Sequence, residues 1–518
     1  MKLKVEKLIE RAKLARDLVM ENQSLFEELD EYASAFKNTW NNSSTYKANN
    51  KTYNSLATTC VNNFINTMTS SFTPVFAQWA ELKAGPMIEV DKRDDVQRKL
   101  DQITEILFAY LNVSNFQTSS AEMYYELAKG TSALLITETT DDVPFTFQSI
   151  PLSKIGFLEG KNGKIDFIVR CNEIENRLIK ETWKKAKLSD TLERAIKDNP
   201  TKKTEVKECF YYDYETFIWH YQVVIEGDKH IIFESTTKTC PIVITRWSKV
   251  PGVVTGEGPL MTALPDIKTL NKMSEYSLKS AALNVFGCYT VADDGVMNPN
   301  SLQIIPGGFI PVSRNGGPEG ASITALPTVG SFQTQEFMID KLEASIKKLM
   351  LNNNMPEESA AVRTAFEISQ RLKEGQLNIG ASYGRLVFEF VIPTFRRILE
   401  ILFKTGRIKT DESIDIDGLF VNVQITSPLA QEQKTEELNK TIQAYSMVAQ
   451  ISPELAMTSF NLEALPKYII EQMGAPANTL RTDEEIAQLQ ATQQQQQQLE
   501  FMQQMALKTG NINPEQPM

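Results

Sequence analysis

Residues 124–135 read Tyr124-Tyr125-Glu126-Leu127-Ala128-Lys129-Gly130-Thr131-Ser132-Ala133-Leu134-Leu135 and contain the main change of pattern in the chain. The first half of this stretch closes a helical pattern of apolar residues, and the pattern changes at Gly130. The following run, Thr131 to Thr137, is short, apolar and typical of a strand. We therefore expect helices before residue 130 and a mixed region of helices and strands after it.

The N-terminal side of this stretch predicts amphipathic helices. Apolar residues fall on one stripe of residues 1–39, with Lys and Glu opposite, which indicates one helix ended by Asn41-Asn42-Ser43-Ser44. Residues 53–72 predict a second helix that ends near Pro74. Residues 92–128 predict two more, separated around Asn115.

The C-terminal side predicts an α+β block followed by long helices. Residues 143–250 hold strand-like runs, including 164–170, 217–226 and 241–247, with a helical insert around 180–198. Beyond them the expected elements are a helix at 262–285, a small β module at 288–328, a helix at 332–352, a loop, a long helix at about 362–404, a β segment at 405–428, helices near 431–449 and 462–473, and a Gln-rich tail. Gly375, Gly380 and Gly384 weaken the long helix, and Pro393 should bend it. Its apolar stripe predicts core and subunit packing.

The composition is that of a globular protein with an acidic balance. Of 518 residues, 42% are hydrophobic and 23% are charged, and the net charge is −11. A protein that grips DNA over a broad surface is usually basic. The balance therefore indicates either plain solubility or a surface that lets a polyanion slide past. Charges interrupt the N-terminus, and no apolar run is long enough to cross a bilayer, so we expect neither a signal peptide nor a membrane span.

Cysteine and histidine form no metal-ligand pattern. The five cysteines are scattered, and their odd number excludes a complete set of intrachain disulfides: Cys60, Cys171, Cys209, Cys240 and Cys288. We expect reduced, buried thiols. His220 and His230 have no cysteine nearby, so no metal site and no cofactor are expected.

Motifs of nucleotide-dependent and hydrolytic enzymes are absent. The sequence has neither the Gly-rich loop that ends in Gly-Lys-Ser/Thr nor a Gly-x-Ser-x-Gly elbow. The segment 160–164 is interpreted as a turn between strands, Gly256-Glu257-Gly258 lacks a third glycine, and Asp293-Asp294 lies in a turn context. We therefore expect no catalytic residues and no enzymatic activity.

Several segments, taken in order, resemble one family, the head-to-tail connectors or portal proteins of podovirus-type phages. The matching pieces are 72–82, 124–135, Arg246-Trp247, Gly256-Glu257-Gly258-Pro259, 264–271, 363–368 with Arg371, Gly384-Arg385-Leu386, Ser427-Pro428-Leu429-Ala430, Gly474-Ala475-Pro476 and 480–485 with the Gln-rich tail. Each piece is weak alone, and their order over roughly residues 70–500 carries the resemblance. Phe366 stands where a small polar residue is more usual, and residues 180–205 match no motif.

The resemblance implies a mainly helical α+β portal fold assembled as a ring of about twelve copies, a homododecamer around a channel. It implies these domains: 1–261 wing, 262–287 first stem helix, 288–330 clip, 331–351 second stem helix, 352–362 channel loop, 363–430 long kinked channel helix and wing return, 431–492 crown and 493–518 Gln-rich tail. It also implies a virion protein at the portal vertex, made in the host cytoplasm. Its implied partners are its own copies, the major capsid protein, the terminase, tail adaptor or nozzle proteins, and double-stranded DNA passing through without sequence specificity.

The residues expected to face DNA are Arg363, Asn352, Asn353 and Asn354. A ring repeats one Arg as a belt of positive charge, and residues 341–407 hold eleven Lys and Arg against seven Asp and Glu. Alternatively, Arg363 pairs with Glu357, Glu358 or Glu367 at the helix start, and the asparagines serve turn chemistry.

Two other classes of function stay open at this point. One is another virion component, such as a tail or internal scaffold protein, which negative-stain images would show as fibres or solid particles. The other is a DNA-packaging enzyme, which ATP turnover by the purified protein would reveal. The missing nucleotide loop weighs against the enzyme.

Overall fold

The computed structural model describes residues 3–34, 52–286 apart from 76, 141 and 228, and then 289–291, 323–325, 332–352, 380–408, 421–425, 438, 441–448 and 450. The chain forms two compact units. The first comprises Met1–Ser70 with Tyr110–Lys409, and the second comprises Ser71–Ala109 with Thr410–Met518. Among the described helices, none combines the length and hydropathy required to span a membrane.

The N-terminal segment forms two helices, α1 (Val5–Met20) and α2 (Gln23–Ala33), so the expectation of a single helix over 1–39 was wrong. The chain turns at Asn22, whose φ of −99° and ψ of 15° are not helical. Asparagine favours such turns because its short polar side chain competes for backbone hydrogen bonds. The turn lets the buried faces of the two helices contact different parts of the unit.

The remaining N-terminal helices follow the sequence pattern. They are α3 (Leu56–Ser71), α4 (Val90–Val113) and α5 (Phe116–Ala128). The predicted break at Asn115 is confirmed, and the structure shows its cause. The Asn115 amide donates to the carbonyl oxygen of Phe147 at 2.7 Å and accepts from the Phe147 N–H at 2.9 Å. This pair of bonds fixes the α4–α5 turn against strand β3 (Phe145–Ile150).

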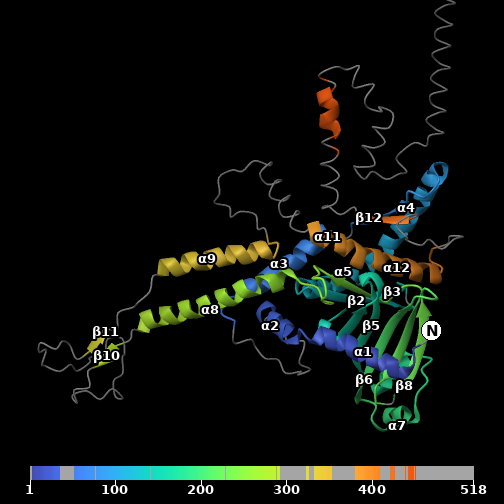
Figure 1. The fold of residues 1–518 in the computed structure, drawn as a ribbon, viewed down its shortest axis with the longest axis horizontal. Coiled ribbons are helices and arrows are strands. Elements are labelled where there is room, and N and C mark those ends of the chain that lie inside the picture. The colour runs from blue at the N-terminus through green and yellow to red at the C-terminus, as the bar shows by residue number, and fades with distance from the viewer. Residues whose placement is uncertain are drawn as a thin grey trace, which may run out of the picture. The chain divides into compact units, whose positions relative to one another are not determined.

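Antiparallel sheets of three and five strands lie in the first unit (Figure 1). The smaller has the order β3-β2-β9, with β2 (Thr131–Glu138) central and β9 (Ile242–Arg246) at one edge. The larger has the order β4-β5-β6-β7-β8, with bounds Ile155–Glu159, Ile165–Glu175, Lys203–Asp213, Ile218–Ile225 and His230–Thr237. The predicted turn at 160–164 is confirmed as the short helical turn η2 (Lys161–Gly163), and η1 (Leu152–Lys154) precedes β4.

Helices cover both faces of the five-stranded sheet. On one face, α1 buries its apolar stripe, Leu8, Ala12 and Ala15, against β5, β6 and β7. A Cβ atom at Gly156 of β4 would lie 2.7 Å from the backbone nitrogen of Arg16, so glycine is what lets α1 approach this closely. On the other face lie α6 (Asn176–Thr182) and α7 (Asp190–Asp198), which resolve the predicted helical insert into two helices.

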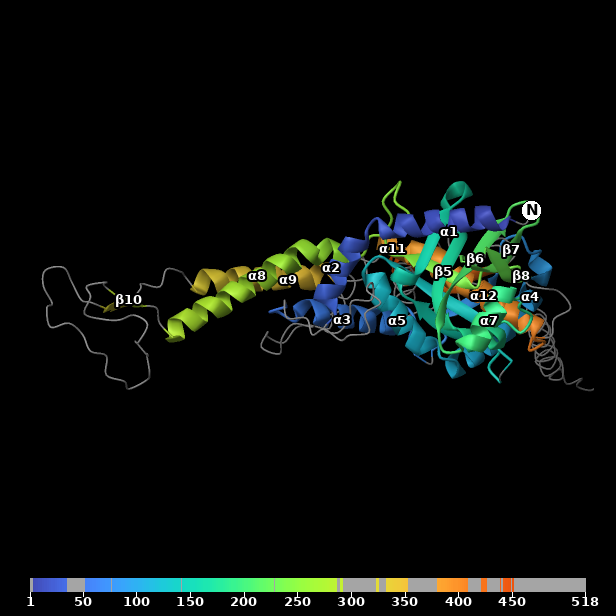
Figure 2. The ribbon, with the colours of Figure 1, turned by 90° about the horizontal axis from the view of Figure 1, so that it is seen from below.

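A long antiparallel helix pair extends from the sheets, formed by α8 (Pro259–Phe286) and α9 (Phe332–Leu349). The two helices run side by side in both views (Figures 1 and 2). Their register is marked by the Ser345 hydroxyl donating to Asp266 at 2.9 Å and by Ser277 and Gln335 at 3.5 Å. Of the expected β module between them, β10 (Tyr289–Val291) and β11 (Ile323–Ala325) are described, and they pair antiparallel.

The described part of the long helix begins at Gly380. It comprises α11 (Gly380–Leu386), a π-helical turn η4 (Val387–Val391) and α12 (Ile392–Lys404). The irregularity falls where Pro393 was expected to disturb the helix, because proline cannot donate the usual backbone hydrogen bond. At this point the N–H of Ile392 bonds Val387, five residues back. Leu386, Phe390 and Val391 are fully buried, as their apolar stripe predicted.

In the second unit, β1 (Ala80–Ala84) pairs antiparallel with β12 (Val421–Ile425), which lies in the expected β segment at 405–428. Side chains of α4 bond the backbone of β1. Gln97 accepts from the Ala84 N–H at 2.8 Å and donates to the Leu82 carbonyl at 3.0 Å, and Thr104 accepts from the Leu82 N–H at 3.3 Å. These bonds satisfy backbone groups that a two-stranded sheet would otherwise leave unpaired.

Candidate functional site: a buried junction of turn, sheet and long helix

Three glycine backbones meet where α5 turns into β2. Gly130 has a φ of +124°, and a Cβ atom there would lie 2.3 Å from the carbonyl oxygen of Gly256 and 2.8 Å from the nitrogen of Gly258. The Trp247 N–H donates to the Gly130 carbonyl at 2.9 Å, and the Gly256 N–H donates to the Thr131 hydroxyl at 2.7 Å. Two distant stretches of the chain, 124–135 and 246–259, therefore form one close-packed turn, from which α8 begins.

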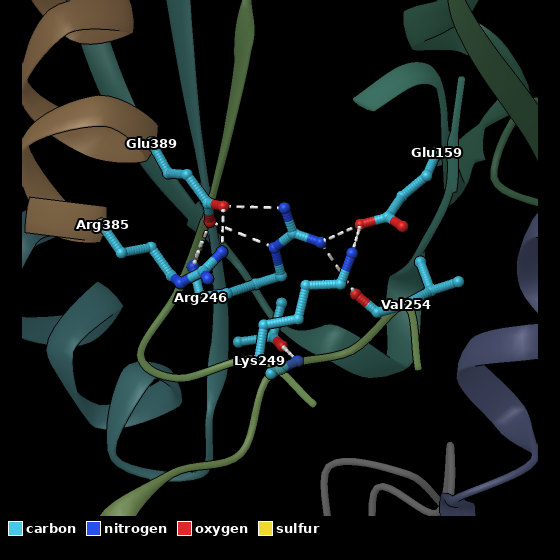
Figure 3. Close-up of polar contacts among 8 residues, drawn as sticks. Glu159, Arg246, Lys249, Val254, Arg385 and Glu389 are labelled. Carbon is cyan, nitrogen blue, oxygen red and sulfur yellow. Dashed lines mark hydrogen bonds and ion pairs between the residues drawn. The ribbon is translucent and has the colours of Figure 1, made fainter. Parts of the chain in front are cut away.

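The Arg246 side chain, 4% exposed, lies beside this turn and is the centre of an ion-pair network (Figure 3). Its guanidinium donates to Glu389 through Nε at 3.1 Å and through Nη2 at 2.7 Å. Through Nη1 it donates to Glu159 and, at 3.3 Å, to the carbonyl of Val254. The arginine fork thus binds the long helix, the end of β4 and the turn before α8 at the same time.

The outer part of the network adds two more cations. Lys249 pairs with Glu159, and Arg385 pairs with Glu389 at 2.9 Å from one helical turn away. Glu389 also accepts the backbone N–H of Arg246 at 3.0 Å, which covers part of the edge of β9. On the next helix, Glu400 accepts the N–H groups of Lys238 and Thr239 at 2.9 and 3.1 Å. Two glutamates therefore attach the long helix to the segment that contains β9.

The electrostatics keep the network charged. Burial lowers the pKa of Arg246, but its bonds to Glu389 and Glu159 outweigh burial and raise that pKa above its ordinary value. Burial likewise raises the pKa of Glu159, but bonds from Lys249 and Arg246 outweigh it and lower that pKa. Both shifts favour the charged forms of Arg246 and Glu159, as expected for groups that hold an ion pair together. The network therefore fits a structural role, in which ion pairs hold the long helix, β4 and the turn before α8 together.

A second buried cluster joins α2 to α5, with Lys129 at its centre. The Lys129 ammonium is 2.9 Å from Asp30 and 2.9 Å from Glu126, and the side chains are at most 8% exposed. The Tyr125 hydroxyl donates to Asp30 at 3.3 Å. Burial lowers the pKa of Lys129, but the two carboxylates outweigh burial and raise it. Burial is the largest effect on Glu126 and raises the pKa of that carboxyl by desolvation. The Lys129 ammonium lowers the pKa but does not outweigh burial and the nearby Asp30 carboxylate.

We expect Glu126→Gln to stabilise the protein increasingly as pH rises above about 4.5, the ordinary pKa of this side chain. A raised pKa in the folded state means that folding favours the protonated acid. The stability that Glu126 contributes is therefore fully present below its ordinary pKa and is lost as pH rises through the raised pKa. The amide oxygen still accepts a hydrogen bond from Lys129, and the Lys129–Asp30 ion pair that remains has no net charge. Thermal denaturation at pH 5 and pH 8 should show a gain of roughly 2 °C at pH 8 only. Asp30→Asn, the matched control, should lower the melting temperature, and a loss in Glu126→Gln would contradict the argument.

Of the predicted DNA-facing residues, Asn352 is described, and Arg363, Asn353 and Asn354 lie outside the described residues. Asn352 is 8% exposed, and its amide lies 3.7 Å from the sulfur of Cys60. Its N–H bonds the Lys347 carbonyl at 2.8 Å, after Leu351 at a φ of 57°. These contacts favour the turn interpretation of Asn352. The DNA-contact role stays a prediction for all four residues.

Cysteine and histidine take structural places in the described part of the chain. Cys60, Cys171 and Cys209 are buried thiols, and Cys240 is partly buried. His220 stacks on Tyr211 with ring centroids 5.0 Å apart. Within the described ranges, no three His, Cys, Asp or Glu side chains are placed to hold a metal ion. Cys288 and Asp293-Asp294 lie outside those ranges.

The sequence motifs contained Arg246 and Arg385 but did not indicate their partners. Glu159 and Glu389 lie 87 and 143 residues from Arg246 in the chain. No spacing rule connects residues at such separations. The motifs at 246–247, 256–259 and 384–386 nevertheless converge on this one junction, which gives their resemblance to a family a structural reason.

These features define a mainly helical α+β protein that fixes a projecting helix pair and a long helix to a sheet through a saturated, buried ion-pair network. The family model of the bacteriophage head to tail connecting protein matches residues 5–480, so the chain belongs to that family. The resemblance inferred from the motifs is thereby confirmed.

Two curated relatives agree with this assignment. The chain is 21% identical to the probable portal protein of Bordetella phage BPP-1 over 448 residues, which cover 79% of this chain and 76% of the relative. It is 22% identical to the portal protein of Escherichia phage T7 over 258 residues, which cover 50% of this chain and 46% of the relative. The second match thus spans about half of each protein.

Proposed function

We propose that the chain is a phage portal subunit that forms a ring of about twelve copies at one capsid vertex. The ring conducts double-stranded DNA during packaging and ejection and acts by geometry, without catalysis. It offers a docking platform to the terminase, then to tail adaptor or nozzle proteins, and contacts the major capsid protein. It is assembled in the host cytoplasm and stays in the virion. Family membership and the names of the two relatives support this proposal.

The domain assignment follows the same proposal. The helix α8 is the first stem helix, α9 is the second, and the strand pair β10–β11 belongs to the clip between them. The remaining assignments are residues 1–261 as wing, 352–362 as channel loop, 363–430 as long channel helix and wing return, 431–492 as crown and 493–518 as tail. In this arrangement the Arg246 network lies at the stem base and fixes both the stem and the channel helix to the wing.

The observation that carries ring formation is the exposed apolar surface on the distal half of the α8–α9 pair. On α8, Tyr276 is 54% exposed and Leu278 is 57% exposed. On α9, Phe337 is 68% exposed and Met338 is 46% exposed. The basal half of the pair, in contrast, buries residues such as Leu264 and Ile346. A helix pair with large apolar groups exposed requires a cover, and a neighbouring copy supplies it.

Charge on the same surface fits a head-to-tail contact. On α8, Lys272 and Lys279 share the single partner Glu275, which leaves one positive charge. On α9, the exposed Glu336 and Asp340 make no ion pair with any described residue. The 3.5 Å contact between Ser277 and Gln335 shows that these charges lie at similar heights along the pair. An α8 surface of one copy is therefore complementary to the α9 surface of the next.

Phe337→Asp should prevent closure of the ring. A carboxylate at this exposed position keeps the chain folded but places a charge in the apolar contact, where it would have to be desolvated. Native mass spectrometry and end-on negative-stain images should show rings for the wild type and mainly smaller species for the variant. Phe217→Asp is the matched control, since Phe217 is 71% exposed on the β6–β7 turn, away from the helix pair. A wild type that stays monomeric, or normal rings in Phe337→Asp, would overturn the proposal.

We also propose that Arg363, with Asn352, Asn353 and Asn354, faces DNA in the channel. Arg363→Ala should then assemble normally but change DNA packaging or retention, because a ring of positive charge is removed. Packaged DNA per particle and its leakage on heating measure this. Failure of the variant to assemble would favour pairing of Arg363 with Glu357, Glu358 or Glu367.

A further inference from the structure

Residues 176–203, which contain α6 and α7, form a basic module in an acidic chain. They hold nine Lys and Arg against four Asp and Glu, whereas the whole chain has a net charge of −11. The nine cations are Arg177, Lys180, Lys184, Lys185, Lys187, Arg194, Lys197, Lys202 and Lys203, and all are exposed. This segment matched no family motif, and the stem, channel and clip assignments leave it without a role.

The cations of the basic module are mostly unneutralised. Arg177 pairs with Glu175 at 2.7 Å, and Lys180 lies 3.8 Å from Glu193. For the other seven, the described residues provide no ion pair. Solvated lysines on an ordinary helix face usually alternate with acids that offset them. Here Lys184, Lys185 and Lys187 follow one another within four residues, and Lys202 and Lys203 are adjacent.

The module is also rigidly built, so its cations are displayed on a fixed base. Ile179, Trp183 and Leu192 are buried against strands β6, β7 and β8. The Trp183 indole donates to the Tyr221 hydroxyl at 3.0 Å. The buried Asn176 donates to the Asn199 carbonyl at 2.9 Å and accepts from Thr204 at 2.6 Å, which ties the start of α6 to the end of α7. Fixed cations lose less entropy on binding than cations on a mobile loop.

We propose that the basic module binds the phosphate backbone of double-stranded DNA, without sequence specificity, at a site outside the channel. Seven of the nine cations are lysine, a residue that binds phosphates as a point charge and is depleted in protein–protein interfaces. The module's one aromatic residue, Trp183, is 5% exposed, so it offers no stacking platform for single-stranded bases. Backbone phosphates of a duplex are the ligand that these groups fit.

The module packs on a different sheet from the described part of the proposed channel helix, which contacts β9 and β2 of the three-stranded sheet. The module itself packs on the five-stranded sheet, on the face opposite α1. In Figure 1, α7 lies at the lower edge, well away from the distal end of α8 and α9. The identification of the bound duplex as the packaged genome rests on the proposed function. DNA binding by the module does not require a ring, so DNA binding and the proposed function can fail separately.

The test uses full-length protein and a relaxed, covalently closed DNA minicircle, which cannot be threaded through a closed ring. Binding is measured by fluorescence anisotropy from 50 to 200 mM salt. In the module variant Lys184, Lys185, Lys187, Lys202 and Lys203 become Gln, and in the control variant the exposed Lys4, Lys7, Lys13, Lys154 and Lys164 become Gln. Both variants lose five positive charges, so a difference between them reports position rather than net charge. Native mass spectrometry checks the assembly of each.

The module variant should bind the minicircle at least tenfold more weakly, and the slope of log affinity against log salt should fall by about 3 because phosphate contacts are lost. The control variant should stay within about twofold of the wild type. Equal losses in both variants, or binding of linear duplex without binding of the minicircle, would overturn the site. Polyglutamate binding that depends on the module, with no DNA binding, would overturn DNA in favour of an acidic protein segment. If the wild type forms no rings but the module still binds DNA, the proposed function alone would be rejected.

Discussion

Gly130→Ala is expected to lower the free energy of unfolding by about 3–5 kcal/mol, because it combines backbone strain with a steric clash. Residues with a Cβ atom rarely adopt a φ of +124°. The new methyl group would also lie 2.3 Å from the backbone oxygen of Gly256. The neighbouring atoms belong to the backbone of Gly256 and Gly258, which cannot move aside as a flexible side chain would. Soluble yield and urea denaturation measure the loss.

Gly252→Ala is the control that separates the two causes. Gly252 has a φ of +91°, but a Cβ atom there meets nothing within 4 Å. It should cost only the backbone strain, about 1 kcal/mol. If the two substitutions cost the same, the close approach at Gly130 contributes nothing, and the three-glycine turn does not hold β2 against the start of α8.

Arg246→Met is expected to destabilise the protein by about 3–5 kcal/mol, since it leaves two half-buried carboxylates without their main partner. The methionine fills part of the space but offers no donor to Glu389 or Glu159, whose side chains are 17% and 21% exposed. Chemical denaturation of the purified chain measures the change. Because the network also fixes the base of α8, fewer complete rings should appear in end-on images.

Two comparisons decide whether the centre of the network carries this energy. Arg385→Met removes a partner of Glu389 that is 32% exposed, so it should cost at most about 1 kcal/mol. Combining Arg246→Met with Glu159→Gln and Glu389→Gln should recover part of the loss, because no unpaired carboxylate then remains. The recovery should be incomplete, because Lys249 and Arg385 lose their partners. A cost below about 1 kcal/mol for Arg246→Met alone would show that water replaces the arginine without penalty.

Elements with a strong periodic pattern were predictable from the sequence. The helices α3 to α5, the α8 and α9 helices, and the strands β2, β5, β7 and β9 lie where the sequence placed them. The helix predicted over 1–39 was wrong because the apolar stripe continues through Asn22, and only the packing of each half shows that the chain turns there. The strands β1 and β12 pair across more than three hundred residues, which periodicity cannot indicate.

Local periodicity and motifs in a fixed order were enough to predict most helices and strands, the change of pattern at Gly130 and the family. Which charges meet depends on the folded arrangement. Arg246 finds Glu159 and Glu389, and Lys129 finds Asp30, over separations of 87 to 143 residues. Electrostatic and steric energies depend on distance in space. Separation along the chain does not indicate these energies, because the charges come close only when the sheet and the long helix pack together.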